Sequence, residues 1–363
     1  VGKESMSRSD LLQRLAQAVA ERRQAGLLRR VRSVEAHRGA YVCIDGRELL
    51  NFSSNDYLGL ARHPDLIAAL QRAAVEGVGS GAAHLVCGHH REHVLLEETL
   101  AEWTGRDAAL LFSSGVMANA GVLQALLAPG DICVQDKLNH ASLIDGARAS
   151  GAELRRYPHA DVGAAARQLI RDSARPALLA SDGVFSMDGD SAPLGELARL
   201  CAAEGATLMV DDAHGMGVVG AQGAGSVAAA GLTQMDVPVL MGTLGKALGC
   251  TGAFIAGSAP LIQGLTQFAR SYVYTTAMPP ALAAAARTAV TLAHREHGRR
   301  EKLAVLIARF RRGAAQLGLP LAESTTPIQP ILLGDVERSV AAAQALEHAG
   351  VLVVAIRPPT VAA

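Results

Sequence analysis

The sequence has no excess of charge, no long apolar run and few cysteines, and each absence excludes a class of protein. Basic and acidic side chains balance at 34 each in 363 residues, so no nucleic-acid partner is expected. No apolar run reaches membrane-spanning length, and the N-terminus carries no signal-peptide pattern. The five cysteines form no CxxC pair, which argues against disulfides or a zinc site and favours reduced thiols in the cytoplasm.

Lysine is also scarce. Lys302 lies in a charged run that is typical of a solvated helix face, so Lys137 and Lys246 are the candidates for chemistry. Residues 242–246 (GTLGK) are too short for a phosphate-binding P-loop, and Ala247 stands where that motif needs Ser or Thr. The complete set of lysines is Lys3, Lys137, Lys246 and Lys302.

Two strand exits carry the residues on which the interpretation depends. An apolar segment over 206–210 leads to Asp211 and His214, and a second one over 239–241 leads to Lys246. Parallel α/β sheets gather their chemistry at the carboxyl ends of strands. One Asp, one His and one Lys placed there suit a pyridoxal phosphate (PLP) site, in which the lysine forms a Schiff base and the carboxylate keeps the pyridine nitrogen protonated. A surface or phosphate-contacting lysine is the alternative interpretation of Lys246.

The order of the predicted elements indicates an α/β fold with a mostly parallel central sheet. The predicted division is an N-terminal helix and hairpin over 1–50, a large domain over 51–280 and a smaller C-terminal α/β domain over 281–363. The hairpin is expected to turn at Asp45–Gly46. Helices are expected over 10–31, 93–103, 281–296, 302–317 and 336–348, and strands near 108–112, 131–135, 177–182, 208–210, 239–241, 252–256, 328–333 and 351–356.

Two other patterns compete with the PLP interpretation. His89, Glu92 and His93 follow the H-x-x-E-H spacing of an inverted zinc peptidase, with two histidine ligands and a glutamate base. Apolar positions continue past His93, which favours an ordinary packed helix with a hydrogen-bonded or capping histidine. Asp211 and Asp212 resemble a magnesium pair, but no phosphate-loop lysine accompanies them. We therefore expect no metal site.

Four spaced motifs resemble the α-oxoamine synthases, which are fold-type I PLP enzymes that join an amino acid to an acyl thioester with loss of carbon dioxide. The resemblance runs from about residue 10 to the end of the chain. Within the family, residues 188–193 (DGDSAP), 212–217 (DAHGMG) and 356–361 (IRPPTV) are most similar to enzymes that condense L-alanine with a pimeloyl thioester. The four motifs are residues 51–60 (NFSSNDYLGL), 183–189 (GVFSMDG), 210–215 (VDDAHG) and 243–246 (TLGK).

The resemblance implies a role for each residue around the cofactor. Lys246 would carry PLP and later move the Cα proton, and Asp211 would pair with the pyridinium nitrogen. His140 would stack on the ring face, while Ser186 and His214 would bond the ring 3-oxygen. The phosphate contacts implied are Gly115, Val116 and Thr243, together with Thr275 or Thr276 of the partner subunit.

The resemblance also implies the substrate contacts and the assembly. Arg357 would bind the amino-acid carboxylate through two parallel hydrogen bonds, with Asn55 and Thr360 near it. Arg29, in an arginine-rich segment, would meet the acyl chain. A cytoplasmic homodimer with sites at its interface is expected, and the thiol carrier is CoA or acyl carrier protein. The alternatives are a 2-amino-3-oxobutyrate CoA ligase, which uses glycine and acetyl-CoA, and a non-catalytic PLP-binding protein.

The chain departs from the family pattern in three places. Asp182 stands where a longer glutamate is usual, so its contact is expected to be weaker or bridged by water. Ala362 replaces an expected proline. The family normally continues for another strand and helix, so we expect the small C-terminal domain to be truncated.

Overall fold

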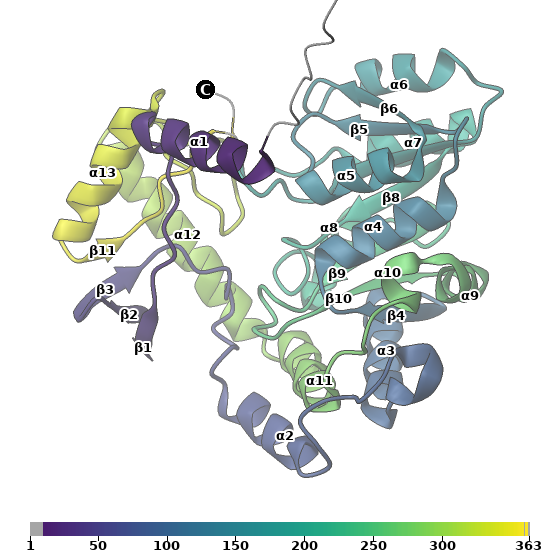
Figure 1. Cartoon of the computed structure of the whole chain (residues 1–363), viewed down its shortest axis with the longest axis horizontal. Coiled ribbons are helices and arrows are strands. Elements are labelled where there is room, and N and C mark those ends of the chain that lie inside the picture. The colour runs from purple at the N-terminus through teal and green to yellow at the C-terminus, as the bar shows by residue number, and fades with distance from the viewer. Residues whose placement is uncertain (1–9, 359, 362–363) are drawn as a thin grey trace, which may run out of the picture. The chain divides into compact units, whose positions relative to one another are not determined.

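The computed structural model describes residues 10–358 and 360–361, and the chain forms two compact units, whose elements are labelled in Figure 1. One unit spans residues 55–331, and the other joins the described residues before Asn55 to those after Ile331. This grouping differs from the predicted three-part division, because residues 281–331 belong to the larger unit. In the described part of the chain, every helix is too short or too polar for a membrane-spanning segment.

A seven-stranded sheet forms the centre of the larger unit, which confirms the predicted α/β fold. Its order is β4-β10-β9-β8-β7-β5-β6, and β10 is the one strand that runs antiparallel to its neighbours. The remaining pairs among β5 to β9 are parallel. The strands are β4 (Ala108–Phe112), β5 (Ile132–Asp136), β6 (Glu153–Tyr157), β7 (Ala177–Asp182), β8 (Thr207–Asp211), β9 (Val239–Thr243) and β10 (Ala253–Gly257).

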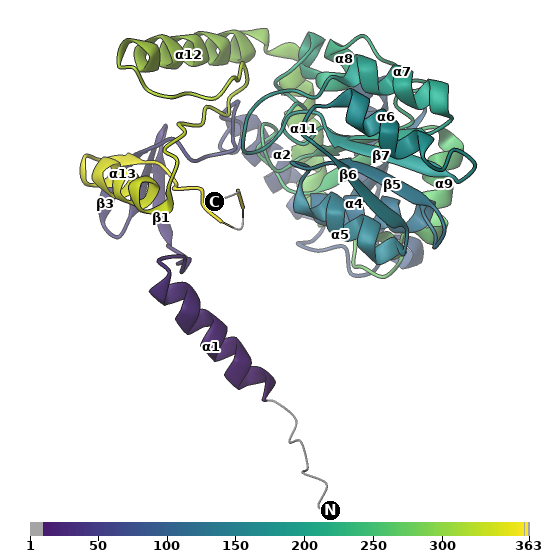
Figure 2. The same cartoon turned by 90° about the horizontal axis from the view of Figure 1, so that it is seen from above.

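Helices cover both faces of this sheet because successive residues of a strand point to opposite sides. On β8, Leu208 and Val210 pack with α6 and α7, whereas Met209 packs with α4 and α5; Figure 2 shows these helix pairs on either side of the strands. A further cluster joins β4 and β10 to α3 and α11. The helices of this unit are α2 (Pro64–Ala74), η1 (His84–Gly88), α3 (Arg91–Thr104), α4 (Gly115–Leu126), α5 (Ala141–Ser150), α6 (Val162–Ile170), α7 (Leu194–Glu204), η2 (Ala221–Gly223), α8 (Ser226–Ala229), α9 (Ala259–Phe268), α10 (Arg270–Val273), α11 (Pro280–Arg295) and α12 (His297–Gln316).

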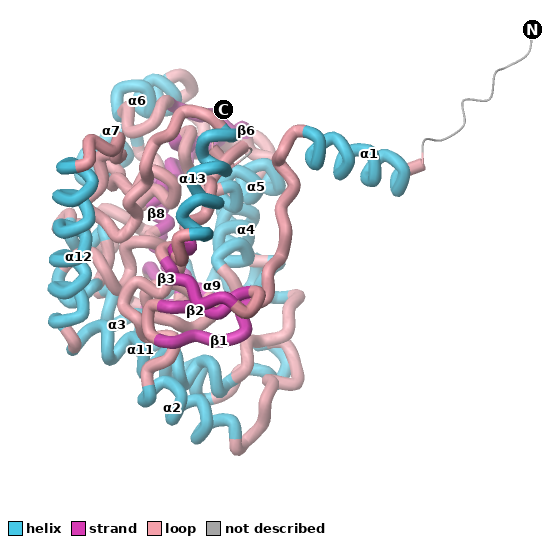
Figure 3. The backbone as a smooth tube through the Cα atoms, turned by 90° about the vertical axis from the view of Figure 1, so that its left-hand side faces the viewer, coloured by secondary structure: helices cyan, strands magenta, loops and turns pink. Residues whose placement is uncertain are grey.

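The smaller unit is built on a four-stranded sheet of order β1-β2-β3-β11. The predicted hairpin turn is confirmed: Asp45 and Gly46 both have positive φ, at 51° and 70°, as a two-residue type I′ turn requires. Val42, Ile44 and Leu49 form its small apolar core. The elements are α1 (Leu11–Gln24), β1 (Val34–Arg38), β2 (Tyr41–Ile44), β3 (Arg47–Asn51) and α13 (Val336–His348), which Figure 3 labels, and β11 (Val351–Leu352), which Figure 1 labels.

Three predicted elements are shorter than expected or absent. The strand predicted over 351–356 ends at Leu352. The first helix ends at Gln24 instead of residue 31, because Gly26 adopts φ 67° and closes a Schellman cap with Leu27 N–H donating to Arg22. The strand predicted over 328–333 is wrong: this segment makes only an isolated bridge between Leu321 and Ile331.

Candidate active site

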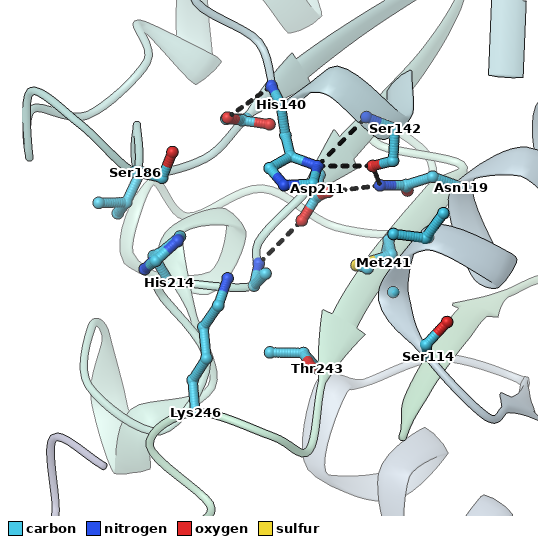
Figure 4. Close-up of a pocket in the computed structure, with 15 residues that line it drawn as sticks. Ser114, Asn119, His140, Ser142, Ser186, Asp211, His214, Met241, Thr243 and Lys246 are labelled. Atoms are coloured by element: carbon cyan, nitrogen blue, oxygen red, sulfur yellow. Dashed lines mark hydrogen bonds between the residues drawn. The ribbon is translucent and has the colours of Figure 1, made fainter. Parts of the chain in front are cut away.

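A cavity of about 210 Å³ in the larger unit collects the polar residues that follow the central strands. Three of its residues leave adjacent strands: Asp182 ends β7, Asp211 ends β8 and Thr243 ends β9. Lys246 follows Thr243 by three residues and extends into the cavity in Figure 4. The lining contains these predicted site residues: Gly115, Val116, His140, Ser186, Asp211, His214, Thr243 and Lys246.

The Asp211 carboxylate is buried and held in a fixed orientation. Its Oδ2 accepts a hydrogen bond of 2.6 Å from Asn119 Nδ2, and its Oδ1 accepts one of 3.1 Å from the Ala213 N–H. Asn119 also donates to Ser142 Oγ at 2.9 Å, while its own Oδ1 is buried without a partner among the described residues. A charge held this rigidly in a low-dielectric site interacts strongly with a cation placed beside it.

His140 begins α5, and its ring borders the cavity. Its backbone N–H donates to Asp182 Oδ2 at 3.1 Å, and its Nδ1 lies 2.7 Å from Ser142 Oγ. Burial, reinforced by the nearby Asp211 carboxylate, raises the pKa of Asp182 well above its ordinary value. Asp182 Oδ1 has no hydrogen-bond partner among the described residues, so this carboxyl group can donate or accept a further bond in the cavity.

His214 is held from behind by a tyrosine. The Tyr57 hydroxyl and His214 Nδ1 share a hydrogen bond of 2.8 Å, and the same hydroxyl lies 3.3 Å from Asn55 Oδ1. Burial lowers the pKa of His214 to about 3, with Lys246 and His140 adding to the effect. The imidazole is therefore neutral at physiological pH and can both donate and accept a hydrogen bond.

Burial also lowers the pKa of the Lys246 amine, although the carboxylates of Asp211, Asp182 and Asp212 oppose the shift. A lysine with a lowered pKa has more of its amine in the unprotonated form, which is the nucleophilic and basic form. The competing lysine, Lys137, is exposed and does not line the cavity.

The first turn of α4 forms one wall of the cavity. Ser114 is the N-cap, and its side chain accepts from Met117 N at 3.3 Å. Gly115 and Val116 are the first helical residues, so their backbone N–H groups have no partner within the helix and are suited to bind an anion. A Cβ on Gly115 would lie 2.7 Å from Met241 Cε, so glycine keeps this wall open.

These groups together fit PLP. The open helix N-terminus offers donors for a phosphate, the buried Asp211 carboxylate can pair with a protonated ring nitrogen, and the Lys246 amine can hold the aldehyde carbon. The unpartnered oxygens of Asn119 and Asp182 show that this cavity retains hydrogen-bonding capacity that the protein itself does not use.

Six predicted site residues lie outside the lining of this cavity. Asn55 is exposed but connects to it through Tyr57 and His214. Thr275 and Thr276 precede α11 in the same unit. The other three, Arg29, Arg357 and Thr360, belong to the smaller unit.

The sequence interpretation gave no role to Asn119, Ser142 or Tyr57. Asn119 lies four residues after Gly115 on α4, a spacing that returns a side chain to the same helix face and that could have revealed it. Ser142 follows His140 by two residues at the start of α5. Tyr57 belongs to the 51–60 motif, but its contact with His214 spans 157 residues and no local signal predicts it.

Comparison with known proteins shows the family to which the chain belongs. Residues 47–363 match the family described as aminotransferase class I and II. The 8-amino-7-oxononanoate synthase of Hahella chejuensis is 54% identical over 350 residues, covering 96% of this chain and 88% of that protein. A serine palmitoyltransferase structure from S. paucimobilis, with bound PLP–myriocin aldimine, has a TM-score of 0.93 at 29% identity and covers 98% of this chain and 91% of its own. An 8-amino-7-oxononanoate synthase structure from Francisella tularensis has a TM-score of 0.76 at 29% identity, with 86% and 89% covered.

Proposed function

We propose that this chain, which belongs to the aminotransferase class I and II family, is a PLP-dependent acyltransferase with the activity of 8-amino-7-oxononanoate synthase. The reaction condenses L-alanine with a pimeloyl thioester, releases carbon dioxide and free thiol, and belongs to biotin biosynthesis. The observation that carries the proposal is that Lys246 and Asp211 share one cavity with the open N-terminus of α4.

PLP supplies an electron sink that stabilises negative charge at the amino-acid Cα. The phosphate is assigned to the first turn of α4 and to Thr243, and the pyridine nitrogen to Asp211. His140 covers the ring face. Two groups, His214 and Ser186, remain for the ring 3-oxygen, and the neutral state of His214 lets it donate this bond without adding a charge.

Lys246 is the group that moves protons. Its amine has a lowered pKa, so it can take the proton from the Cα of alanine and return a proton to the same carbon after carbon dioxide has left. Asp211, fixed by Asn119, would stand beside the pyridine nitrogen of the cofactor. The buried surroundings of both groups exclude water and strengthen these interactions.

We assign the alanine carboxylate to Arg357. Its Nη2 donates to Leu28 O at 3.2 Å and its Nη1 to Ala355 O at 3.5 Å, and each of these nitrogens carries a second N–H that can serve a carboxylate. Arg29 donates to Thr360 Oγ1 at 2.8 Å, which orients the arginine that we assign to the acyl chain. Asn55 is assigned to the amino-acid end.

We further propose a homodimer in which Thr275 and Thr276 bind the phosphate held by the partner subunit. Neither threonine lines the cavity of its own chain. Exposed apolar side chains near them, such as Tyr274 at 72%, give this part of the surface the character of an interface. The thiol carrier is CoA or acyl carrier protein, and the five free cysteines suit the cytoplasm.

A substrate panel tests the proposal. Alanine, glycine and serine are each combined with acetyl, pimeloyl and palmitoyl thioesters, and thiol release gives kcat/KM. Alanine with pimeloyl thioester should be the best pair. Glycine should be poorer but active, since one methyl group is worth only ~1–3 kcal/mol. Lys246→Ala is the control, because it removes the only lysine of the cavity and should abolish turnover.

Each other outcome of the panel identifies a different function. Faster turnover of glycine with acetyl-CoA would identify a 2-amino-3-oxobutyrate CoA ligase. A preference for serine with palmitoyl thioester would identify a serine palmitoyltransferase. No turnover with any pair, in a protein that still holds PLP, would identify a non-catalytic binding protein.

A further inference from the structure

Three imidazoles gather at the start of α3, outside the cavity described above. His84 begins η1, His89 follows this turn, and His93 lies in the first turn of α3; one ring nitrogen from each lies within 4.8 Å of the other two. Their ring centroids are 5.0, 5.1 and 5.4 Å apart. Three imidazoles around one tetrahedral zinc ion, with Zn–N distances of about 2.0–2.1 Å, have their centroids about 5 Å apart. The rings therefore already stand at the spacing of metal ligands.

One of the rings also has the hydrogen-bonded outer partner that metal-bound histidines require, and a second has a carboxylate nearby. His93 Nε2 donates to the Met278 carbonyl at 2.8 Å, and His89 Nε2 lies 3.6 Å from Glu97 Oε2. A histidine ligand ordinarily gives its second ring N–H to a carbonyl or a carboxylate, which fixes the tautomer and aims the other nitrogen. The second nitrogens are then the Nδ1 atoms of His93 and His89.

Two of the Nδ1 atoms are within reach of one another. His84 Nδ1 and His89 Nδ1 lie 2.8 Å apart, where they share one proton. A metal ion that binds both Nδ1 atoms takes the place of this proton. The proton moves to the Nε2 of the same ring, so both imidazoles stay neutral. His93 Nδ1 accepts from the His90 N–H at 2.9 Å, and metal binding exchanges this bond for a coordinate bond.

An adjoining cavity of about 340 Å³ gives access to the rings of His84 and His89 and leaves room for a fourth ligand. Glu97 and Tyr272 line the same cavity.

We propose that His84, His89 and His93 bind one divalent transition-metal ion, Zn²⁺ in preference, and that Glu97 orients His89. The site differs from the inverted zinc peptidase pattern, because Glu92 pairs with Arg287 at 3.1 Å and is not the base of a hydrolytic centre. Its ligands tie η1 and α3 to the segment before α11, where Thr276 forms a bridge with Ala83. Metal binding therefore stabilises the segment that carries Thr275 and Thr276.

The test uses the full, PLP-loaded chain after treatment with a chelator. Zn²⁺ is titrated in competition with a fluorescent chelator, and Co²⁺ is added separately to record its visible absorption. One equivalent of Zn²⁺ per chain and the intense Co²⁺ bands of a tetrahedral centre are expected. Glu97→Gln should weaken binding about 10–100-fold as a positioning residue. His84→Gln and His89→Gln should weaken it more, and His348→Gln, on the exposed end of α13, should leave it unchanged.

Two results would overturn the proposal. Zn²⁺ binding that persists in both His84→Gln and His89→Gln would mean that the metal binds at another site, such as the histidines of the cavity that contains Lys246. A wild-type chain that takes up no Zn²⁺ in the competition assay would mean that the cluster is only a hydrogen-bonded histidine group. If either variant fails to fold, X-ray absorption at the zinc edge of the wild type decides, because it must report three imidazole nitrogens.

Discussion

Replacing Asp211 by asparagine removes the charge from the proposed ring partner with little change of shape. Asp211 is only 5% exposed, and its two oxygens accept from Asn119 and from Ala213 N–H. Asparagine offers one acceptor instead of two, so one of those donors loses its partner, which costs about 1–3 kcal/mol of stability. Loss of one member of a buried charge pair costs about 3–5 kcal/mol, which corresponds to about 10²–10⁴ in kcat.

Thiol release with alanine and pimeloyl thioester measures this loss, and circular dichroism and PLP absorbance confirm that the variant is folded and loaded. Asn119→Asp combined with Asp211→Asn separates charge from hydrogen bonding. The double variant returns a donor and an acceptor to the 2.6 Å contact but moves the charge to position 119. It should recover the stability of the single variant without recovering kcat. Asp211→Asn activity within about threefold of wild type, which is under 1 kcal/mol of barrier, would refute the role of Asp211.

Two further predictions test the local structure. The His159 ring bonds Asp136 at 3.1 Å and Asp190 at 2.8 Å, and although burial opposes the charge, these bonds raise the pKa of His159 above 6.5. The contribution of His159 to the free energy of unfolding is therefore present below pH 6.5 and is lost as the pH rises through the raised pKa. Urea unfolding should show this fall of stability with pH in the wild type and not in His159→Gln. An equal pH dependence in both proteins would contradict the prediction. Gly115→Ala places a methyl group against Met241, so PLP should bind about tenfold or more weakly by equilibrium dialysis, whereas Gly264→Ala, where a Cβ meets nothing within 4 Å, should bind it normally.

The sequence predicts well which residues meet in the candidate cavity, because they follow strands that are easy to recognise. Asp211 ends β8 and Lys246 follows β9, and parallel neighbours bring both to the same edge of the sheet. Asn119 and Tyr57 are harder to predict. They act through contacts that span 92 and 157 residues, and spacing along the chain says nothing about such contacts.

The grouping of the two ends of the chain could not be predicted either. It depends on β11, which pairs with β3 through only two residues, Val351 and Leu352, about 300 positions away. The strand expected over 328–333 fails for a local reason. Pro330 has no N–H for a ladder, and the backbone groups of Ile328 are bonded locally: its N–H donates to Thr326 Oγ1 and its carbonyl accepts from Ser324 Oγ.

The histidine cluster confirms the expectation of a packed, hydrogen-bonded histidine, because His93 Nδ1 caps the His90 N–H and its Nε2 bonds the Met278 carbonyl. The rings of His89 and His93 lie together, as their spacing predicts, but His89 precedes α3 instead of sharing a side of it. The third histidine, His84, stands in η1, a turn that the sequence interpretation did not predict. Glu92, the base in the motif, is held by Arg287 instead.

The central claim is that Lys246 is the lysine that holds PLP, and borohydride reduction followed by peptide mapping tests it most directly. Lys246 lines the cavity with Asp211, whereas Lys137 is exposed and outside it. We expect one pyridoxyl group per chain, on the peptide that contains Lys246, and none in Lys246→Ala. A pyridoxyl group on Lys137, or equal labelling of several lysines, would contradict the account.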